Sequence, residues 1–334
     1  MTQHKTQTPD GVPSSTGSTS RVRAFLEQYR GGKIFHPPLV DLQGKLVGNN
    51  GDRLMVLGTD IVYRDLGIRR VDRGEDADLI VIGGNGGMLE RAYHIPRIFR
   101  QCSTGFPGVP MCVLPSTYYY PTKPFAEEIG ERSAPLTLFC REAYSYQHLL
   151  EQHRLPSCCR VELDRDMAFE LEGGDLVSRL RAMALRHVLF VERTDVEHDA
   201  ATFTSRSGGM GAKLRKRLPE PLKKLLYPFV KAARSRKITP FRERCELLLG
   251  ERCPQHVQLP RVVGDMSNVN VCTFDEFCAH IGGSAAVFTT RLHVGILSVM
   301  LGRPTFIFEG PYHKIRGIYE HSLSGRPGVE FVPR

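Results

Sequence analysis

The chain has 334 residues, of which 41% are hydrophobic and 24% are charged. This composition is typical of a globular protein, and the length is sufficient for two α/β domains. No apolar run approaches the roughly 18 residues that a membrane-spanning helix requires. The net charge of +9 comes from one segment. Residues 206–244 contain 13 Lys or Arg and two Glu, a charge of +11, so the rest of the chain has a charge of −2.

Residues 1–20 are polar and rich in Thr, Ser and Gln. They lack the apolar core of a secretory signal, so we expect a disordered leader. The nine cysteines form an odd set without a CxxC pair, which favours buried free thiols over a disulfide framework and points to a reducing cytoplasm. No cluster of His, Cys and carboxylate residues has the spacing of metal ligands, so no metal site is predicted.

Short apolar runs alternate with helical stretches from Pro37 onward, a pattern typical of parallel sheets covered on both faces by helices. Helices are expected at about 53–66, from about 88, and at 142–150. The strands expected in this half are 39–42, 77–82, 110–114 and 136–140, and residues 160–169 close it.

A second half of the same kind begins near residue 186 and is interrupted by the basic segment 206–244. Strands are expected at 187–191, 285–289 and 305–308, with helices at 274–281 and 292–301, and the pattern resumes after the basic segment at 256–263. We therefore predict two doubly wound, Rossmann-like α/β domains that face a cleft, at 21–180 and 181–334. In open parallel sheets, ligands bind beyond the carboxyl ends of the strands.

The strongest chemical signal lies where the strand 285–289 ends. Thr290 can cap the next helix, and Arg291 and His293 fall in its first turn. Free backbone N–H groups, the positive helix end and a guanidinium together suit a carboxylate or a phosphate. His293 adds a group that can move a proton near neutral pH. The alternative is an Arg and a His that only pack at a helix end.

Several motifs, in order along roughly residues 37–320, together resemble the polysaccharide pyruvyl transferase family. The carboxyl-terminal ones are Thr-Arg-Leu-His at 290–293, Gly-Arg-Pro at 302–304 and Tyr-His-Lys-Ile-Arg-Gly at 312–317. The amino-terminal ones are Asn-Asn-Gly-Asp at 49–52, the glycine-rich turn 82–87, Val-Leu-Pro-Ser-Thr at 113–117, Cys-Arg-Glu-Ala-Tyr-Ser at 140–145 and Asp-Met-Ala-Phe at 166–169.

This resemblance implies a glycosyltransferase-B-like pair of domains and the transfer of a pyruvyl group from phosphoenolpyruvate to a sugar, as a ketal. The carboxyl-terminal domain would bind the donor and the amino-terminal domain the acceptor. The implied donor ligands are Arg291, His293, Leu292, Arg141 and Lys314, and the acceptor-side candidates are Asn50, Gly84, Asn85 and Ser116. No cofactor is implied beyond the donor substrate.

Ketal formation needs a proton donor, a base for the hydroxyl groups and charge stabilisation for the departing phosphate. His293 could supply the proton. Asp52 could be the base, or alternatively a helix N-cap, a common use of Asp after Gly. The turn 83–87 lacks the spacing of a nucleotide-binding loop, so it is either a tight turn that only glycine tolerates or a cleft-facing turn near the acceptor.

The basic segment 206–244 mixes cations with large apolar residues. Such a segment can lie on an anionic membrane surface, which would make the protein peripheral on the inner membrane face and suit a lipid-linked oligosaccharide acceptor. A solvated insert is the alternative, and no nucleic-acid-binding module accompanies the charge. Two other functions stay open: a nucleotide-sugar glycosyltransferase of similar architecture, and an inactive scaffold in envelope polysaccharide assembly.

Overall fold

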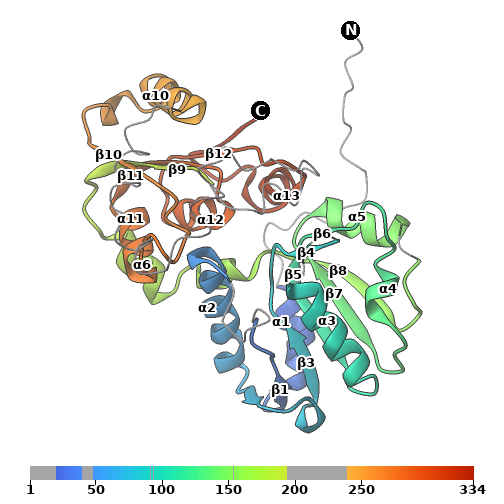
Figure 1. Ribbon diagram of the computed structural model, residues 1–334. Helices are drawn as coiled ribbons and strands as arrows, with labels where there is room; N and C mark the ends of the chain where they lie inside the picture. The colour runs from blue at the N-terminus through green and yellow to red at the C-terminus, as the bar shows by residue number, and fades with distance from the viewer. Residues whose placement is uncertain (1–19, 40–47, 91, 93, 153, 194–238) are drawn as a thin grey trace, which may run out of the picture. The chain divides into compact units, whose positions relative to one another are not determined.

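The computed structural model describes residues 20–39, 48–90, 92, 94–152, 154–193 and 239–334 (Figure 1). The chain divides into two compact units. Unit 1 contains Met1–Leu39, Val62–Met167 and Gly317–Ser322, and unit 2 contains Val40–Ile61, Ala168–Arg316 and Leu323–Arg334. The predicted border at residue 180 differs from this division, because each unit also takes short segments from the other half of the sequence.

Unit 1 is built on a six-stranded, all-parallel sheet in the order β2-β1-β3-β5-β7-β8. Its strands are β1 (Lys33–Phe35), β2 (Arg69–Val71), β3 (Leu79–Ile82), β5 (Met111–Ser116), β7 (Leu136–Cys140) and β8 (Cys159–Leu163). Its helices are α1 (Arg21–Leu26), α3 (His94–Gly105), α4 (Ala126–Ile129) and α5 (Ala143–Gln152), and α2 (Asn50–Asp65) begins in unit 2 and ends in unit 1.

Three helices pack on one face of the unit 1 sheet. Phe99 of α3, Ile129 of α4 and Leu149 of α5 share a buried cluster with alternate residues of the central strands, such as Ile80 and Ile82. Alternation is expected because successive side chains of a strand point to opposite faces. The connections after β3, β5 and β7 all run in the same direction along the sheet, so right-handed crossovers place these helices on the same face.

Unit 2 is built on a five-stranded, all-parallel sheet in the order β10-β9-β11-β12-β13. Its strands are β9 (His187–Val191), β10 (Arg261–Val263), β11 (Ser284–Thr289), β12 (Thr305–Phe308) and β13 (Val329–Val332). Its helices are α6 (Asp175–Arg181), α10 (Pro240–Arg252), α11 (Phe274–Gly282), α12 (Leu292–Met300) and α13 (Lys314–Ile318), which ends at the border with unit 1.

Helices cover both faces of the unit 2 sheet (Figure 1). On one face, Cys245 and Leu249 of α10 pack against Phe190 and Phe288 of the strands. On the other face lies α12, whose nine residues are all buried, as expected for a helix that is apolar on every side. The expected α/β class with parallel sheets is therefore confirmed.

Two expected elements differ from the structure. The strand expected at 39–42 falls mostly outside the described residues, and the first strand is β1 instead. A helix was expected from Met88, but Met88–Leu89 forms the short strand β4, paired in parallel with β6 (Tyr118–Tyr119), and the helix begins at His94. Pro96 explains the later start, because proline fits the first turn of a helix and breaks its interior.

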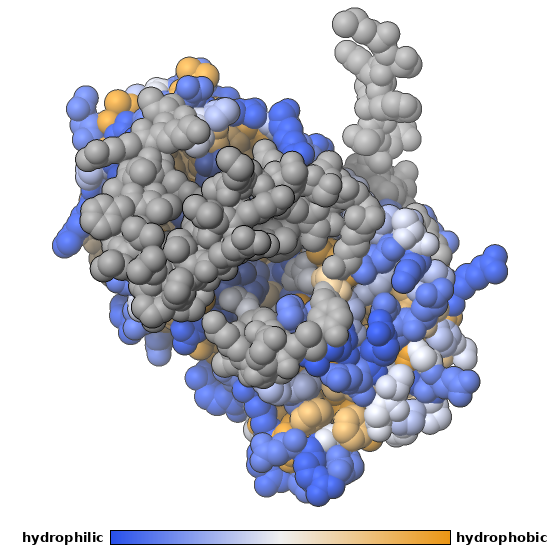
Figure 2. Space-filling view, viewed as in Figure 1, coloured by the Kyte–Doolittle hydropathy of each residue, from blue (hydrophilic) through white to orange (hydrophobic). Residues whose placement is uncertain are grey.

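On the face shown in Figure 2, the described residues are mostly hydrophilic, with smaller apolar areas among them. Large exposed apolar side chains, such as Leu247 and Leu150, are far apart in the sequence. Among the described residues, no helix combines the length and the hydropathy needed to cross a membrane.

Candidate functional site

The unit 2 sheet has a topological switch point between β9 and β11. The chain leaves β9 toward β10 on one side, through α10, and leaves β11 toward β12 on the other side, through α12. Connections that part in this way leave a crevice at the carboxyl ends of the two strands, which is where open α/β sheets bind their ligands. In unit 2, the residues at this edge are Glu192 and Arg193 after β9 and Thr290 after β11.

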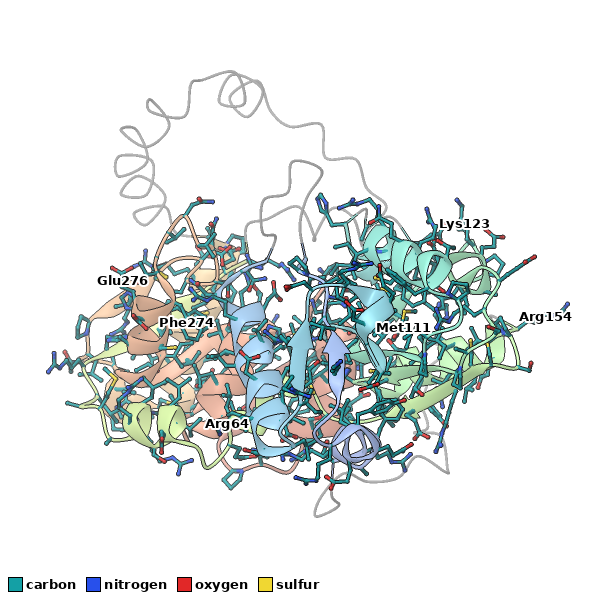
Figure 3. The ribbon with its side chains drawn as sticks, turned by 90° about the horizontal axis from the view of Figure 1, so that it is seen from below. Arg64, Met111, Lys123, Arg154, Phe274 and Glu276 are labelled. Atoms are coloured by element: carbon teal, nitrogen blue, oxygen red, sulfur yellow. The ribbon has the colours of Figure 1, made fainter. Side chains whose placement is uncertain are left out.

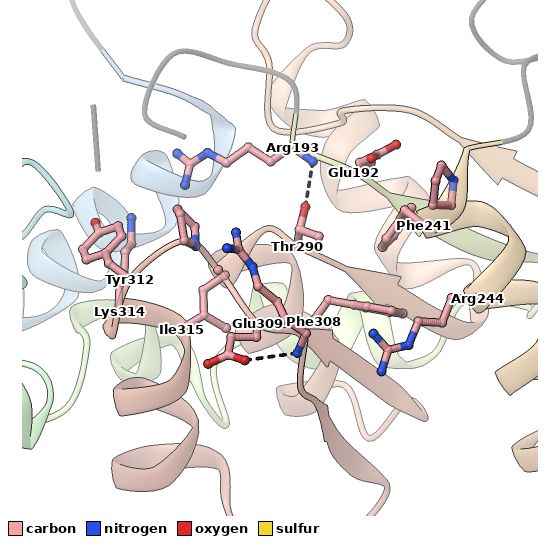
Figure 4. Close-up of a pocket in the computed structure, with 14 residues that line it drawn as sticks. Glu192, Arg193, Phe241, Arg244, Thr290, Phe308, Glu309, Tyr312, Lys314 and Ile315 are labelled. Atoms are coloured by element: carbon pink, nitrogen blue, oxygen red, sulfur yellow. Dashed lines mark hydrogen bonds between the residues drawn. The ribbon is translucent and has the colours of Figure 1, made fainter. Parts of the chain in front are cut away.

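A cavity of about 330 Å³ lies at this switch point (Figure 4). The backbone N–H of Arg193 donates a 2.7 Å hydrogen bond to the Thr290 hydroxyl, which ties the ends of β9 and β11 together. The remaining lining comes from the first turns of α10, from the stretch between the end of β12 and the start of α13, and from Arg334, two residues after β13. The lining residues are Glu192, Arg193, Pro240, Phe241, Arg244, Thr290, Phe308, Glu309, Gly310, Pro311, Tyr312, Lys314, Ile315 and Arg334.

The cavity lining is cationic and aromatic. Its charged side chains are Arg193, Arg244, Lys314 and Arg334 against Glu192 and Glu309, so the formal charge is two units positive. The rings of Phe241 and Phe308 meet edge to face with centroids 4.9 Å apart. The Arg244 guanidinium lies 5.7 Å from the centroid of the Phe308 ring, within range of a cation–π interaction.

The two carboxylates that line the cavity, Glu192 and Glu309, each accept hydrogen bonds from neighbouring groups. Burial raises the pKa of Glu309, but hydrogen bonds from the Arg316 guanidinium and the Arg334 backbone N–H outweigh this effect and lower the pKa below its ordinary value. Glu192 accepts a 3.3 Å hydrogen bond from the hydroxyl of Thr239, the N-cap of α10. Because Glu309 is already paired with Arg316, which lies outside the lining, the cavity favours an anion.

Lys314 is the one predicted donor ligand that lines this cavity, and it is 7% exposed. Arg291, Leu292 and His293 follow Thr290 directly and are buried without lining it. The Arg291 guanidinium forms a bidentate pair with Asp265, with an Nε–Oδ1 distance of 2.9 Å. This pair holds the start of α12 against the segment after β10.

Gly51 and His293 are in close contact, although they are far apart in the sequence. A β-carbon on Gly51 would lie 2.7 Å from the His293 β-carbon and 2.8 Å from its Nδ1. Only a glycine fits this approach. The first turn of α2 therefore lies beside the first turn of α12, both within unit 2.

Asp52 lies in the first turn of α2, next to Gly51. Its Oδ2 accepts hydrogen bonds from the backbone N–H (2.8 Å) and the side-chain amide (2.7 Å) of Asn49, and the Asn49 Oδ1 accepts from the Gly51 N–H at 2.8 Å. This reciprocal pattern is a capping box in which Asn49 is the cap and Asp52 the third helical residue. The alternative that Asp52 is the N-cap is therefore wrong, because the helix begins two residues earlier, at Asn50.

Asn50, expected on the acceptor side of the amino-terminal half, belongs to unit 2. It is 1% exposed, and its Nδ2 donates to the backbone oxygens of Met266 (3.1 Å) and Cys272 (3.0 Å). Its backbone N–H donates to the Ser267 oxygen at 2.8 Å. Asn50 thus joins the start of α2 to the loop before α11.

The other predicted residues lie in unit 1. Arg141 has no exposed surface, and it donates through Nη1 to Asp166 at 2.6 Å and through Nε to the Thr117 hydroxyl at 2.9 Å. Asn85 is 3% exposed, and its backbone N–H donates to the fully buried Ser116 hydroxyl at 3.1 Å.

A β-carbon on Gly84 would lie 3.0 Å from the Pro115 carbonyl oxygen. In unit 1 these contacts fasten the turns after β3, β5 and β7 to one another. The structure brings Arg291, His293 and Asp52 into unit 2 with Lys314, and it leaves Arg141, Asn85 and Ser116 in unit 1.

Sequence reasoning missed most of the cavity. Arg193 could have been found, because it follows the clearly predicted strand β9 at its carboxyl end. Arg244 and Phe241 were assigned to the basic insert 206–244, whereas residues 240–252 form α10, and residues 206–238 of that insert lie outside the described residues. Within the described ranges, no group of three or more His, Cys, Asp or Glu side chains is arranged to hold a metal ion.

Comparison with known proteins supports the fold alone. No family model matches the sequence, and no curated protein matches it. The structure is similar to a crystal structure of a functionally uncharacterised protein from Klebsiella pneumoniae, with a TM-score of 0.56 and 18% sequence identity over 93% of this chain and 97% of the other. A UDP-GlcNAc 2-epimerase from Methanocaldococcus jannaschii gives a TM-score of 0.34 and 10% identity over 85% of this chain and 71% of the other.

Proposed function

We propose that this protein is a pyruvyl transferase, which moves a pyruvyl group from phosphoenolpyruvate to a sugar and forms a cyclic ketal. The observation that carries the proposal is the cationic cavity at the switch point of unit 2, with the buried Lys314 in its wall. Phosphoenolpyruvate carries a phosphate and a carboxylate, so its binding site needs several cations in a confined space. We propose a glycosyltransferase-B-like pair of Rossmann-like domains as the architecture.

The proposed residue roles follow from the two helix starts in unit 2. One oxygen of Asp52 is used in the capping box, and Oδ1 has no hydrogen-bond partner among the described residues, so it can accept a proton. His293, which contacts Gly51 and follows the cavity-lining Thr290 by three residues without itself lining the cavity, is the proposed proton donor to C3 of the enol. The pair with Asp265 holds Arg291 at the start of α12, where backbone N–H groups and the helix dipole favour an anion, and Arg291 stays a proposed ligand of the donor.

The chemistry balances without a cofactor. Protonation of C3 makes C2 electrophilic, and the first sugar hydroxyl adds there and loses its proton to the base. The second hydroxyl then attacks C2 as the C–O bond to phosphate breaks, and its proton leaves with the phosphate. Cations around the departing phosphate stabilise the charge that develops on it.

Substitution of Lys314 tests the donor site. Lys314→Met should weaken phosphoenolpyruvate binding about 10- to 100-fold, because a charge-assisted hydrogen bond to phosphate contributes about 1.5–3 kcal/mol. The measurement is titration calorimetry with phosphoenolpyruvate. Lys123→Met is the matched control, since Lys123 is exposed in unit 1 (Figure 3), and it should bind like the wild type. Equal affinity in the Lys314→Met variant would remove this lysine from the site.

The reaction class is tested by mass spectrometry of oligosaccharide acceptors incubated with the protein and phosphoenolpyruvate. A mass gain of one pyruvyl group with release of phosphate is expected. Phosphate release without acceptor modification in every preparation would exclude the transferase. The variants Asp52→Asn and His293→Ala should lose most of their turnover in this assay. Their affinity for phosphoenolpyruvate, measured by calorimetry, should fall much less.

A nucleotide-sugar glycosyltransferase is the second candidate, and the aromatic wall of the cavity favours it. Phe241, Phe308 and Tyr312 line the same space, and aromatic faces can stack on a nucleobase. Thermal shift with phosphoenolpyruvate and with a panel of nucleotide sugars distinguishes the two, because a ligand raises the melting temperature only if it binds the folded state.

We further propose a cytoplasmic location with a peripheral membrane contact through residues 206–244, whose positions 206–238 lie outside the described residues. The charge of +11 on this segment supports attraction to anionic lipids. Sedimentation with vesicles of anionic lipid, for the wild type and a deletion of 206–238, tests it, and equal partitioning would end the proposal.

A further inference from the structure

Unit 1 has its own topological switch point, between β1 and β3. In the order β2-β1-β3-β5, the chain leaves β1 toward β2 and leaves β3 toward β5, in opposite directions along the sheet. The rule that locates the unit 2 cavity therefore predicts a second ligand crevice at the ends of these two strands. The residues that follow them are His36 after β1 and Gly83 after β3.

His36 and Gly83 are in contact at this edge. A β-carbon on Gly83 would lie 2.9 Å from Nε2 of His36. The other ring nitrogen, Nδ1, lies 3.0 Å from the hydroxyl of Tyr63, which comes from α2. Nε2 has no hydrogen-bond partner among the described residues, and it is not among their fully enclosed unpaired polar atoms. One hydrogen bond thus fixes the ring and leaves its second nitrogen for a ligand.

The environment keeps this imidazole uncharged. Burial and the positive charge of Arg70 lower the pKa of His36 to about 3, and the Arg70 guanidinium lies 5.3 Å from the centroid of the Tyr63 ring. At neutral pH the ring is therefore neutral, and Nε2 is a donor or an acceptor according to the direction of the bond to Tyr63. A hydroxyl group can satisfy either tautomer, whereas an anion finds no charge on the ring.

We infer that the edge of unit 1 where β1 and β3 end binds the acceptor sugar, one of whose hydroxyl groups is hydrogen-bonded to Nε2 of His36. The inference rests on the proposed transferase function, which requires a hydroxyl-bearing acceptor, and adds the residue that holds it. The glycine at position 83 gives the His36 ring its place at this edge, because a β-carbon there would lie 2.9 Å from Nε2. The two switch points then differ in chemistry: the lining in unit 2 carries a net positive charge, whereas the polar group offered in unit 1 is an uncharged imidazole.

Nitrogen chemical shifts of the histidine rings test the inference in the wild-type protein. The probes are methyl β-D-galactopyranoside, methyl β-D-glucopyranoside and methyl α-D-mannopyranoside, titrated into protein labelled with ¹⁵N-histidine. The Nε2 signal of His36, assigned by its loss in His36→Gln, should move and saturate with at least one glycoside. His187 in unit 2 is the internal control, because its Nε2 is bonded to the His280 carbonyl oxygen at 2.8 Å.

Failure to move the His36 signal with all three glycosides overturns the inference, as does an equal movement of His36 and His187. A second measurement uses variants: His36→Phe keeps a flat ring but loses the hydrogen bond, so it should bind the best glycoside at least tenfold more weakly, whereas His36→Gln should stay within about threefold of the wild type. Equal binding by His36→Phe and the wild type contradicts the inference.

The proposed transferase function and the proposed sugar site can be refuted independently of each other. Phosphoenolpyruvate binding, followed by calorimetry, should be the same in His36→Phe and the wild type, because His36 lies in unit 1 and the cavity in unit 2. If phosphoenolpyruvate binds neither protein while a glycoside still moves the His36 signal, the transferase is excluded and the sugar site remains. If phosphoenolpyruvate binds both and no glycoside moves the signal, the sugar site is excluded alone.

Discussion

At the scale of single residues, two arginines expected to bind an anion are each paired with a buried aspartate. Arg141 and Asp166 have no exposed side-chain surface, and Arg291 and Asp265 are 5% and 4% exposed. A sequence motif shows that an arginine follows a strand, but it does not show which carboxylate lies beside it in the fold. These aspartates are 25 and 26 residues away from their partners, beyond the reach of local pattern.

The Arg141–Asp166 pair leads to a prediction for stability. Arg141→Gln should lower the free energy of unfolding by about 3–5 kcal/mol, because it leaves a buried carboxylate without its counter-charge. Chemical denaturation measures the difference. Arg30→Gln is the control, since the Arg30–Glu27 pair is more than half exposed and its loss should leave stability almost unchanged. A stable Arg141→Gln protein with weak donor binding would instead support a direct contact between Arg141 and the ligand.

At the scale of elements, the starts of α2 and α12 converge through a glycine. Local signals reveal both helices, because Asn49 and Asp52 form a capping box and the strand β11 ends at Thr289, two residues before Arg291. The sequence also assigned Asn50 and Asp52 to the amino-terminal half, since nothing local indicates that α2 begins in one unit and ends in the other.

Gly51→Ala tests this convergence. The added methyl group would lie within 2.8 Å of His293 atoms, so we expect a loss of about 1–3 kcal/mol from overpacking and a fall in turnover as His293 moves. Denaturation and the ketal-forming assay measure the two effects. Gly105→Ala, at the end of α3, meets no atom within 4 Å and is the matched control. Full activity in Gly51→Ala would show that the position of His293 does not matter to the reaction.

The elements that could be predicted are those with a strong periodic signal and a clear boundary. Strands β7, β9 and β12 have the same bounds as the apolar runs that predict them. β13 was missed because its burial is partial, and α10 because its polar composition merges with the basic residues before it. The switch points follow from strand order, which is a property of long-range pairing. For this reason the sequence predicted the α/β class but neither the cavity nor His36.

At the scale of the whole molecule, a buried glutamate couples stability to pH. Glu142 lies at the end of β7, where burial raises its pKa to about 7 even though the backbone and hydroxyl of Ser145 bond to it. Below pH 4.5 the carboxyl is protonated in both the folded and the unfolded state, so it has no effect. As the pH rises to about 7 the unfolded state ionises first, and stability falls by about 3 kcal/mol.

Glu142→Gln should remove this fall. The difference in the free energy of unfolding between the variant and the wild type should grow by about 3 kcal/mol between pH 4.5 and 7 and stay constant above. Denaturation at a series of pH values measures it, and only the slope counts, because Gln also loses one acceptor for the Ser145 N–H. Glu127→Gln, at an exposed position of α4, should follow the wild type. If the difference in the free energy of unfolding between Glu142→Gln and the wild type did not change between pH 4.5 and 7, the prediction for Glu142 would be wrong.

The discontinuous make-up of unit 2 has a consequence for biosynthesis. Asn50 leaves the ribosome long before Met266 and Cys272, whose carbonyl groups it bonds. At about 5–20 residues per second the intervening stretch takes roughly 10–45 s to translate. During that interval the amide of Asn50, which is 1% exposed in the finished protein, lacks the two carbonyl groups to which it is bonded. Unit 2 therefore cannot complete the contacts of Asn50, and with them the start of α2, until residues 266–272 have been translated.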